Sequence, residues 1–210
     1  MLTMYWSAKG GSGTTVVAAG HALTSASDRP TLLVDLDGDL PDVLGVPQPA
    51  AGIAEWVAAG AGVPGDALDR IAVDVGPRLR LLGRGLGPVD DPDRLAVLGR
   101  LLADSRDPTI VDLGRLPNPA ADALLVTAGR SVLVLRPCYL AVSRARALTT
   151  TPTELVIVRD AGRALRDRDI ADALGVPVRA TVPVDVEIAR AVDAGLLAHR
   201  MPRRLRRVAP

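Results

Sequence analysis

A short glycine-rich stretch near the N-terminus has the composition of a phosphate-binding loop. The stretch Lys9–Thr15 holds three glycines within four positions, and Lys9 is the only lysine of the chain. Successive glycines let backbone N–H groups turn inward as an anion nest, and a helix that begins behind them adds the positive end of its dipole. A hydroxyl at Thr15 is placed to coordinate Mg²⁺. The residues predicted to contact phosphate are Lys9, Gly10, Gly11, Ser12, Gly13, Thr14 and Thr15.

The strict phosphate-loop pattern G-x-x-x-x-G-K-[ST] is broken at two positions. Ala8 stands at its first glycine and Thr14 stands at its lysine. The alternative interpretation is a tight turn between a strand and a helix, which needs glycine only for its backbone conformation. Phosphate binding is favoured over this alternative because carboxylates follow two further strands.

Three aspartates are expected at the carboxyl ends of two strands. Asp35 and Asp37 close one apolar run, and their spacing in an extended chain puts both on the same side. Asp112 closes another apolar run, as an acid does in a Walker B strand. Mg²⁺ favours few carboxylates together with waters and phosphate oxygens. We therefore expect a Mg²⁺ and water-positioning set, the alternative for each single acid being a helix cap or a solvated strand end.

The rest of the chain alternates short apolar runs with longer stretches rich in Ala, Leu and Arg. Short apolar runs bounded by Gly, Pro or Asp are typical of strands buried on both faces of a sheet. We expect strands at Leu2–Trp6, Thr31–Asp35, Leu79–Leu82, Thr109–Leu113, Ser131–Leu135, Glu154–Val158 and Arg179–Val182. We expect helices at Thr14–Ala26, Gly52–Ala59, Asp90–Asp104, Pro119–Ala128, Leu140–Thr149, Arg168–Leu174 and Asp185–Leu196. This rhythm predicts an α/β fold with a three-layer, doubly wound, mostly parallel sheet of about seven strands.

One of these strands has a competing interpretation. The run Leu79–Leu82 lies within Val73–Val89, a segment with four glycines and two prolines, so a loop is the alternative there. In doubly wound sheets, ligands bind outside the carboxyl ends of the strands. The residues after Trp6, Val34 and Val111 are therefore where a site is expected.

Composition bounds the class of protein. The 210 residues, 48% of them hydrophobic, fit one core, which we divide into a domain at 1–198 and a basic tail at 199–210. A formal charge of +1 gives no global field able to hold a polyanion. The one cysteine, Cys138, excludes an internal disulfide and a cysteine-built metal cluster. With no run of 18 apolar residues, we expect a cytoplasmic protein.

The order and spacing of the motifs resemble the deviant-Walker-A ATPases, the family that includes ParA and MinD. The match comprises the loop Lys9–Thr15, the strand end Asp35-Leu36-Asp37, Asp112, and a C-terminal part from Leu174 to Gly195 that looks like the family's last strand and helix. It implies a P-loop NTPase-like fold, ATP and Mg²⁺ as cofactors and a homodimer formed on ATP binding. Within the family, Asp35–Gly45 and the missing loop lysine look most like the CpaE/TadZ branch and its actinobacterial septum-site relatives.

The resemblance also implies a role for each site residue. Lys9 would reach across an ATP-sandwich dimer to the partner's phosphates, and Thr15 would bind Mg²⁺ with support from Asp35 and Asp112. Asp37 would orient the attacking water. The segment that begins at Pro183 would pack near the adenine.

Three functions remain open. The favoured one is a nucleotide-dependent dimerising switch that engages a protein partner of a pilus, division or partition system, at the pole or septum. Thr14 removes one cation from the phosphate clamp, so hydrolysis is expected to be slow or absent. The second function is a non-hydrolysing pseudo-ATPase scaffold that acts through partner binding. The third is a metabolic enzyme of the wider P-loop superfamily, for which the chain is short.

The C-terminal segment is rich in arginine. We expect Leu196–Pro210 to be a solvated, partly disordered tail, because Pro202 divides it and few bulky apolar residues accompany the arginines. A membrane or DNA contact through these arginines is the less favoured alternative. His21 is expected to be packed within the first helix, and Trp6 and Trp56 to be core or dimer-contact residues.

Overall fold

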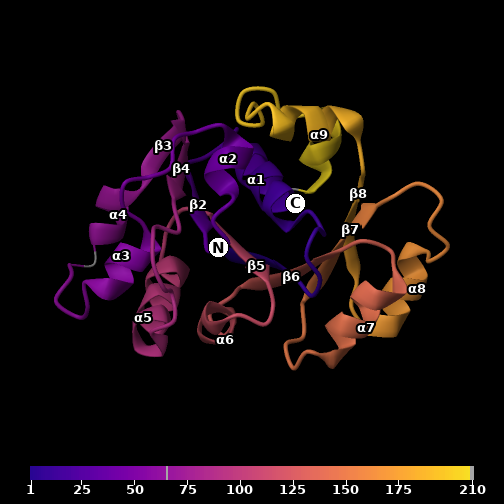
Figure 1. Ribbon diagram of the computed structural model, residues 1–210, viewed down its shortest axis with the longest axis horizontal. Helices are drawn as coiled ribbons and strands as arrows, with labels where there is room; N and C mark the ends of the chain where they lie inside the picture. Colours follow the sequence, from indigo (N-terminus) through magenta and orange to yellow (C-terminus); the bar gives the residue numbers. More distant parts are fainter. Residues whose placement is uncertain (65, 209–210) are drawn as a thin grey trace.

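The computed structural model describes residues 1–64 and 66–208, in which eight strands form one sheet (Figure 1). The strands are β1 (Leu2–Ser7), β2 (Thr31–Asp35), β3 (Val73–Gly76), β4 (Leu79–Leu82), β5 (Thr109–Arg115), β6 (Arg130–Leu135), β7 (Glu154–Arg159) and β8 (Val178–Pro183). Their order across the sheet is β3-β4-β2-β5-β1-β6-β7-β8. All neighbours pair in parallel except β3 and β4. The predicted doubly wound, mostly parallel sheet is confirmed, with eight strands where about seven were expected.

Helices cover both faces of this sheet and complete the three layers. They are α1 (Thr14–Ser25), α2 (Leu40–Leu44), α3 (Ile53–Ala58), α4 (Ala67–Ile71), α5 (Pro92–Ala103), α6 (Pro119–Leu125), α7 (Tyr139–Ala147), α8 (Asp167–Leu174), α9 (Val186–Asp193) and the 3₁₀ helix η1 (Arg203–Val208). Residues of α1, α2, α9 and η1 pack in one core, and residues of α3 to α8 pack in the other. In Figure 1, α1, α2 and α9 lie above the sheet and α5 to α8 lie below it. Among the described residues, no helix combines the length and the apolar character that crossing a bilayer requires.

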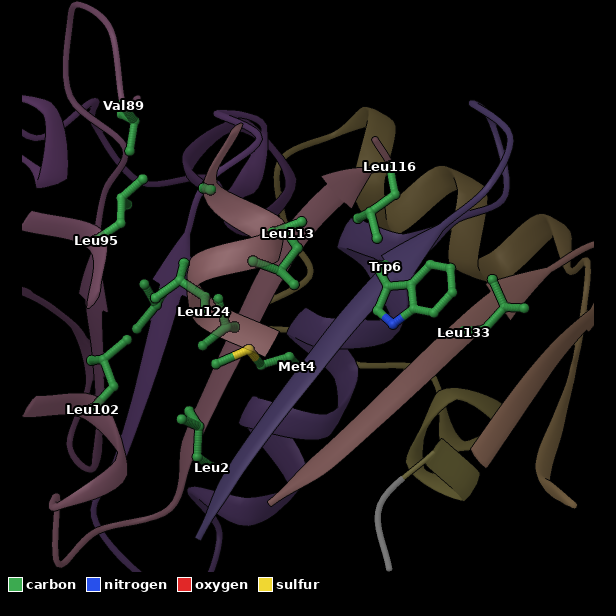
Figure 2. Close-up of a cluster of buried hydrophobic side chains, with 14 of the residues drawn as sticks. Leu2, Met4, Trp6, Val89, Leu95, Leu102, Leu113, Leu116, Leu124 and Leu133 are labelled. Atoms are coloured by element: carbon green, nitrogen blue, oxygen red, sulfur yellow. The ribbon is translucent and has the colours of Figure 1, made fainter. Parts of the chain in front are cut away.

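The central strand β1 shows why the sheet is buried on both faces. All six of its residues are buried, and alternate side chains enter opposite cores. Met4 and Trp6 point into the core drawn in Figure 2, where Trp6 lies beside Leu133. Tyr5 enters the other core, where its hydroxyl lies 2.9 Å from Nδ1 of His21. The prediction that His21 is packed is confirmed, since 3% of its surface is exposed.

Three short elements were not expected. The strand β3 pairs antiparallel at the edge of the sheet and is only partly buried, so it lacks the continuous apolar run of the inner strands. The helices α2 and α4 have five residues each, too few to show an amphipathic period. The competing loop interpretation of Leu79–Leu82 is wrong, because this segment is β4, paired with β2.

The C-terminal segment is not a solvated tail over its described part, and that expectation is wrong there. Leu205 is fully buried and packs over Gly20 of α1, where an added Cβ would lie 2.5 Å from its Cγ. Arg204 forms a 2.8 Å ion pair with Asp185. Leu197 is fully buried in the same core, so two leucines and one ion pair fix a segment that its many arginines made look solvated. Residues 209 and 210 of the expected tail lie outside the described residues.

Replacing Leu205 with alanine should lower the free energy of unfolding by about 2 kcal/mol. This is near the low end for a buried leucine, because a terminal segment can detach on its own. Urea denaturation followed by circular dichroism would measure the change. The matched control is Arg206→Ala, which alters an exposed neighbour and should change stability by less than about 0.5 kcal/mol. Equal effects of the two substitutions would contradict docking through Leu205.

Candidate functional site

The glycine-rich loop joins β1 to α1 as a turn that opens toward solvent. Gly11 and Gly13 have φ values of 72° and 90°, a left-handed conformation that favours glycine. The Ser12 hydroxyl donates to the carbonyl oxygen of Lys9 over 2.6 Å and closes the turn. No side chain caps the N-terminus of α1, and no acid occupies its first turn. Its first N–H groups lack intrahelical partners, so this end of the helix is suited to an anion.

A cavity of about 260 Å³ lies between this loop and the ends of β2 and β5, and we call it the polar cavity because hydroxyl, acidic and basic residues line it. The loop and the start of α1 form one wall, and residues that follow the two strands form the other. The lining residues are Ser7, Gly10, Gly11, Gly13, Thr14, Thr15, Val16, Asp37, Asp39, Val43, Gly114 and Arg115. Of the predicted phosphate-contacting residues, Lys9 and Ser12 do not line the cavity: Ser12 closes the turn behind it, and Lys9 is half-buried at its start.

Asp35 is a buried support for the loop that follows β2. One of its carboxylate oxygens accepts the N–H groups of Asp37 at 3.1 Å and Gly38 at 2.7 Å, and the other accepts the N–H of Leu40 at 3.1 Å. Burial raises the pKa of Asp35 to about 6, against the effect of these hydrogen bonds. Both oxygens are thus engaged by backbone, and the side chain fixes the position of Asp37.

Asp112 is fully buried within β5, which continues to Arg115 and so ends two residues later than expected. One carboxylate oxygen accepts the N–H of Gly114 at 2.9 Å, and the Thr15 hydroxyl also hydrogen-bonds this carboxylate. Burial raises the pKa of Asp112 to about 7, those hydrogen bonds oppose the rise, and the charge of Asp35 adds to it. Its Oδ2 atom has no hydrogen-bond partner. A buried oxygen without a donor, next to a threonine hydroxyl, suits a hydrated divalent cation.

Asp37 lies against the turn that ends β5. Gly114 has a φ of 68°, and a Cβ added there would lie 2.3 Å from Oδ1 of Asp37. Burial and the charge of Asp39 raise the pKa of Asp37, while the guanidinium groups of Arg84 and Arg115 lower it. The carboxylate therefore faces the cavity with cationic side chains close to it. Gly114 is needed here for its conformation and for the space it leaves.

The predicted acids come together but do not form a preformed metal cage. Asp35 and Asp112 are register partners in neighbouring strands, and Asp37 follows within two residues. Within the described residues, no group of three or more His, Cys, Asp or Glu side chains is arranged to hold a metal ion. A cation at this place would take most of its ligands from phosphate oxygens and water, the coordination that Mg²⁺ prefers.

A second, mostly apolar cavity of about 170 Å³ adjoins the first at Gly13 and Val16, which line both. Its other walls come from β7, β8, α9 and Leu205 of η1. Val182 and Val184 line it, whereas Pro183 between them does not. The segment after Pro183 thus borders an apolar space next to the glycine loop, where an aromatic base would fit.

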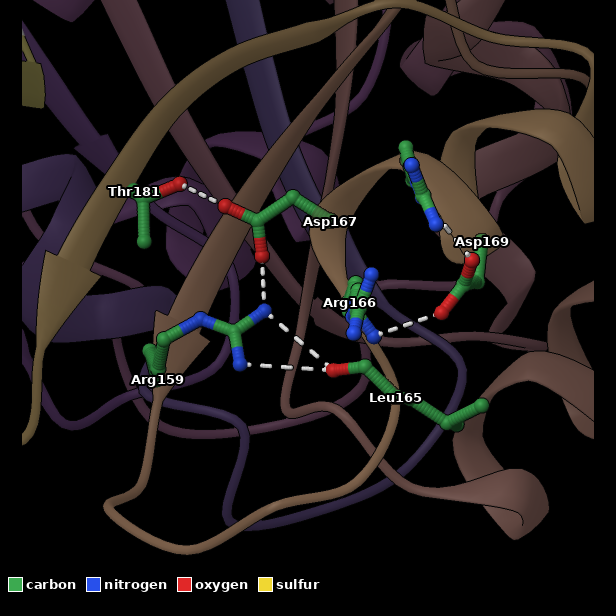
Figure 3. Close-up of polar contacts among 7 residues, drawn as sticks. Arg159, Leu165, Arg166, Asp167, Asp169 and Thr181 are labelled. Carbon is green, nitrogen blue, oxygen red and sulfur yellow. Dashed lines mark hydrogen bonds and ion pairs between the residues drawn. The ribbon is translucent and has the colours of Figure 1, made fainter.

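The residues that follow β7 are held by charge pairs. Figure 3 shows the guanidinium of Arg159 bound to the carboxylate of Asp167 and to the carbonyl oxygen of Leu165. Asp167 in turn accepts the Thr181 hydroxyl at 2.6 Å. Asp160 pairs with Arg136 and Arg163. These partners fix the loop beside the apolar cavity.

Sequence reasoning missed two residues of this site. Arg115 was not among the predicted site residues, yet it lines the polar cavity. Leu205 lines the apolar cavity from a segment expected to be solvated. The signal for Arg115 was its position directly after the acid and glycine that end β5. Leu205 carries no such local signal, since its burial depends on the shape of α1.

Solved structures with this fold include ATPases of the ParA and MinD type. A ParA family ATPase from Chlorobium tepidum superposes with a TM-score of 0.80 at 19% identity, over 99% of this chain and 97% of that one. The septum site-determining protein MinD with Mg-ADP from Pyrococcus horikoshii gives 0.79 at 19% identity, over 99% and 94%. The MinC:MinD cell division complex from Aquifex aeolicus gives 0.73 at 19%, over 93% and 86%. The sequence matches no family model and no curated protein. The expected P-loop NTPase-like fold is thereby confirmed.

Replacing Asp112 with asparagine should stabilise the nucleotide-free protein at pH 8. Because burial raises its folded pKa above the unfolded value, the carboxyl favours the native state only while it is protonated, and this stability is lost as pH rises from about 4 to about 7. The substitution should add roughly 1–2 kcal/mol at pH 8 and almost nothing at pH 4.

Urea denaturation of both proteins across this pH range would measure the difference. Asp107→Asn, at an exposed aspartate, is the control and should leave stability unchanged at each pH. A gain that does not vary between pH 4 and pH 8 would contradict the account of Asp112.

Proposed function

We propose that this protein is a nucleotide-dependent dimerising switch of the ParA/MinD kind, which binds ATP with Mg²⁺ and positions cellular machinery. The observation that carries the proposal is the polar cavity, in which an uncapped helix N-terminus and a glycine loop face the exposed carboxylates of Asp37 and Asp39. The buried acids Asp35 and Asp112 do not line the cavity, but they stand in the two strands that lead to it. The ParA and MinD ATPases of the same fold support this interpretation. Their low identity leaves the function to be argued from the site itself.

The residues present fit a nucleotide with its metal ion. A Cβ added at Gly10 or Gly11 would meet no atom within 4 Å, so the loop leaves open space for phosphate oxygens. In this proposal Gly10, Gly11, Gly13 and Thr14 surround the phosphates, and Ser12 holds the turn. When bound, the nucleotide supplies the phosphoryl group that passes to water, and Mg²⁺ offsets part of its charge.

Thr15 and Asp112 form the metal side of the site. The Thr15 hydroxyl already lies on the Asp112 carboxylate, whose second oxygen is unpartnered. A cation drawn to this pair would keep Asp112 ionised despite its burial. Asp35 acts one step further out, since its hydrogen bonds hold the loop that carries Asp37. Asp37 is the residue assigned to orient the attacking water, because its carboxylate lines the cavity.

Lys9 is assigned to the dimer. Its side chain does not line the cavity of its own chain, and it forms no ion pair with the described residues. A lysine at the rim of the loop can reach a phosphate held by a second copy facing it. Dimerisation would then depend on the bound nucleotide.

The switch would act on a protein partner. A chain of the MinC:MinD cell division complex has this fold, which supports a protein partner for a chain of this kind. The segment Asp35–Gly45 and the missing loop lysine favour the CpaE/TadZ branch and a pilus, division or partition system. Recruitment to the pole or septum follows from that assignment.

A second candidate, a non-hydrolysing scaffold, is favoured by Thr14. This residue lines the cavity where the phosphate-loop pattern has its lysine, and 6% of its surface is exposed. A neutral side chain there withdraws one cation from the transition-state clamp. The scaffold would keep the fold and the dimer surface while nucleotide turnover is lost.

ATP with Mg²⁺ should bind the wild type and produce a dimer, and Lys9→Ala should abolish the dimer while leaving the monomer folded. Titration with a fluorescent ATP analogue reports binding, and light scattering reports mass. Arg100→Ala, at an exposed arginine of α5, is the matched control and should dimerise like the wild type. Unchanged dimerisation of Lys9→Ala would contradict the assignment of Lys9 to the dimer contact. If the folded wild type did not bind ATP at millimolar concentration, the proposed nucleotide switch would be wrong.

Phosphate release separates the switch from the scaffold. The switch predicts slow turnover that falls at least tenfold in Asp37→Asn, because the variant loses the carboxylate that orients water. The measurement is inorganic phosphate released under saturating ATP with Mg²⁺. Equal background rates in the wild type and the variant, with ATP bound in both, would favour the scaffold.

A further inference from the structure

We propose that Arg115 is a phosphate-binding residue that supplies, from the end of β5, the positive charge absent at Thr14. The inference rests on the proposed nucleotide binding and goes further, since it names the side chain that contacts the terminal phosphate. The resemblance to the ParA/MinD family assigns no role to Arg115.

The composition of the cavity wall is the first argument. Twelve described residues line the polar cavity, and Arg115 is the one basic side chain among them. Asp37 and Asp39 are the acidic ones. Without Arg115, the wall would present two carboxylates to a polyanion, and only the dipole of α1 would attract it.

The backbone around Arg115 is fixed, although its side chain is exposed. Arg115 is the register partner of Ser7, and the N–H of Leu116 donates to the Ser7 carbonyl over 2.8 Å. Arg115 therefore stands beside the point where the glycine loop leaves β1. Gly114, with its positive φ, turns the chain just before it. Its guanidinium forms no ion pair with the described residues and acts on Asp37 through its charge, so its N–H groups can donate to a phosphate.

The two cavities indicate which phosphate Arg115 would meet. They adjoin at Gly13 and Val16, so a nucleotide with its base in the apolar cavity would run past Gly13 into the polar one. Arg115 lines the polar cavity on the wall opposite the loop, together with Asp37. The phosphate farthest from the base would therefore lie nearest to Arg115.

Arginine has the chemistry for this contact. Its guanidinium is always charged and presents a planar fork of N–H donors that matches phosphate oxygens. Arg84 is the comparison within the same chain. It also lies near the Asp37 loop, with its Cδ 3.6 Å from a Cβ added at Gly38, but it does not line the cavity.

The test compares nucleotide affinities, measured by isothermal titration calorimetry with Mg²⁺, in the wild type, Arg115→Gln and Arg84→Gln. Arg115→Gln should weaken ATP binding roughly 10- to 100-fold and ADP binding by less than about threefold. Arg115→Lys should recover part of the ATP affinity, because it restores the charge without the fork. Arg84→Gln should stay within about twofold of the wild type for both nucleotides. Inorganic tripolyphosphate, used as a competitor, should lose affinity for Arg115→Gln as ATP does.

Every other outcome would contradict one named part of the proposal. Equal ATP affinity in the wild type and Arg115→Gln would show that Arg115 does not bind phosphate, while the nucleotide switch would stand. Equal losses for ATP and ADP would remove the terminal-phosphate assignment. A loss in Arg84→Gln as large as in Arg115→Gln would show a general effect of charge near Asp37. A wild type that binds neither nucleotide would instead defeat the proposed function. Thermal melts would confirm that every variant is folded.

Discussion

The site depends on the register in which β2 pairs with β5. This register sets Asp35, at the end of β2, directly beside Asp112 within β5, and both acids are fully buried. Burial is the main cause of the raised pKa of both carboxyl groups, and the charge of Asp35 adds to the rise at Asp112, so two ionised carboxylates here oppose folding. A slip of one residue would relieve this cost, but it would also turn each apolar strand face inside out. The apolar pattern of the strands thus enforces the proximity of the acids.

The neighbours of these two acids give them different tasks. Asp35 receives three backbone N–H groups and so belongs to the loop that it shapes. Asp112 receives the Gly114 N–H and the Thr15 hydroxyl, and it keeps one oxygen without a donor. Because their hydrogen-bond partners differ, Asp35 supports the loop, whereas Asp112 keeps an oxygen that can bind a ligand. Perturbed carboxyl groups that remain incompletely paired are characteristic of functional sites.

The sequence predicted the inner sheet and the loop well, for a physical reason. Strands buried on both faces must be continuous apolar runs, and parallel strands bring their ends to one edge, so Thr31–Asp35 was predicted with its observed bounds. The edge strand Val73–Gly76 was missed because half-buried positions carry no such run. Leu205 was missed because its burial is a long-range event that Gly20 permits. Arg115 was missed as a site residue because its role depends on the cavity that it lines. The local sequence pattern does not reveal that cavity.

The proposed phosphate-binding cation, Arg115, lies on β5 and not on the glycine loop. This position lets it act on Asp37 as well as on phosphate. The phosphate-loop pattern has its lysine at the position of Thr14, at the start of α1, whereas Arg115 lies one residue from the glycine against which Asp37 packs. Without a ligand, the charge of Arg115 helps to keep Asp37 ionised. A phosphate that drew Arg115 away would leave Asp37 with less support for its charge, and a carboxylate so placed holds a proton more readily. Arg115 would then link the binding of a ligand in the cavity to the protonation state of Asp37, the residue assigned to orient water.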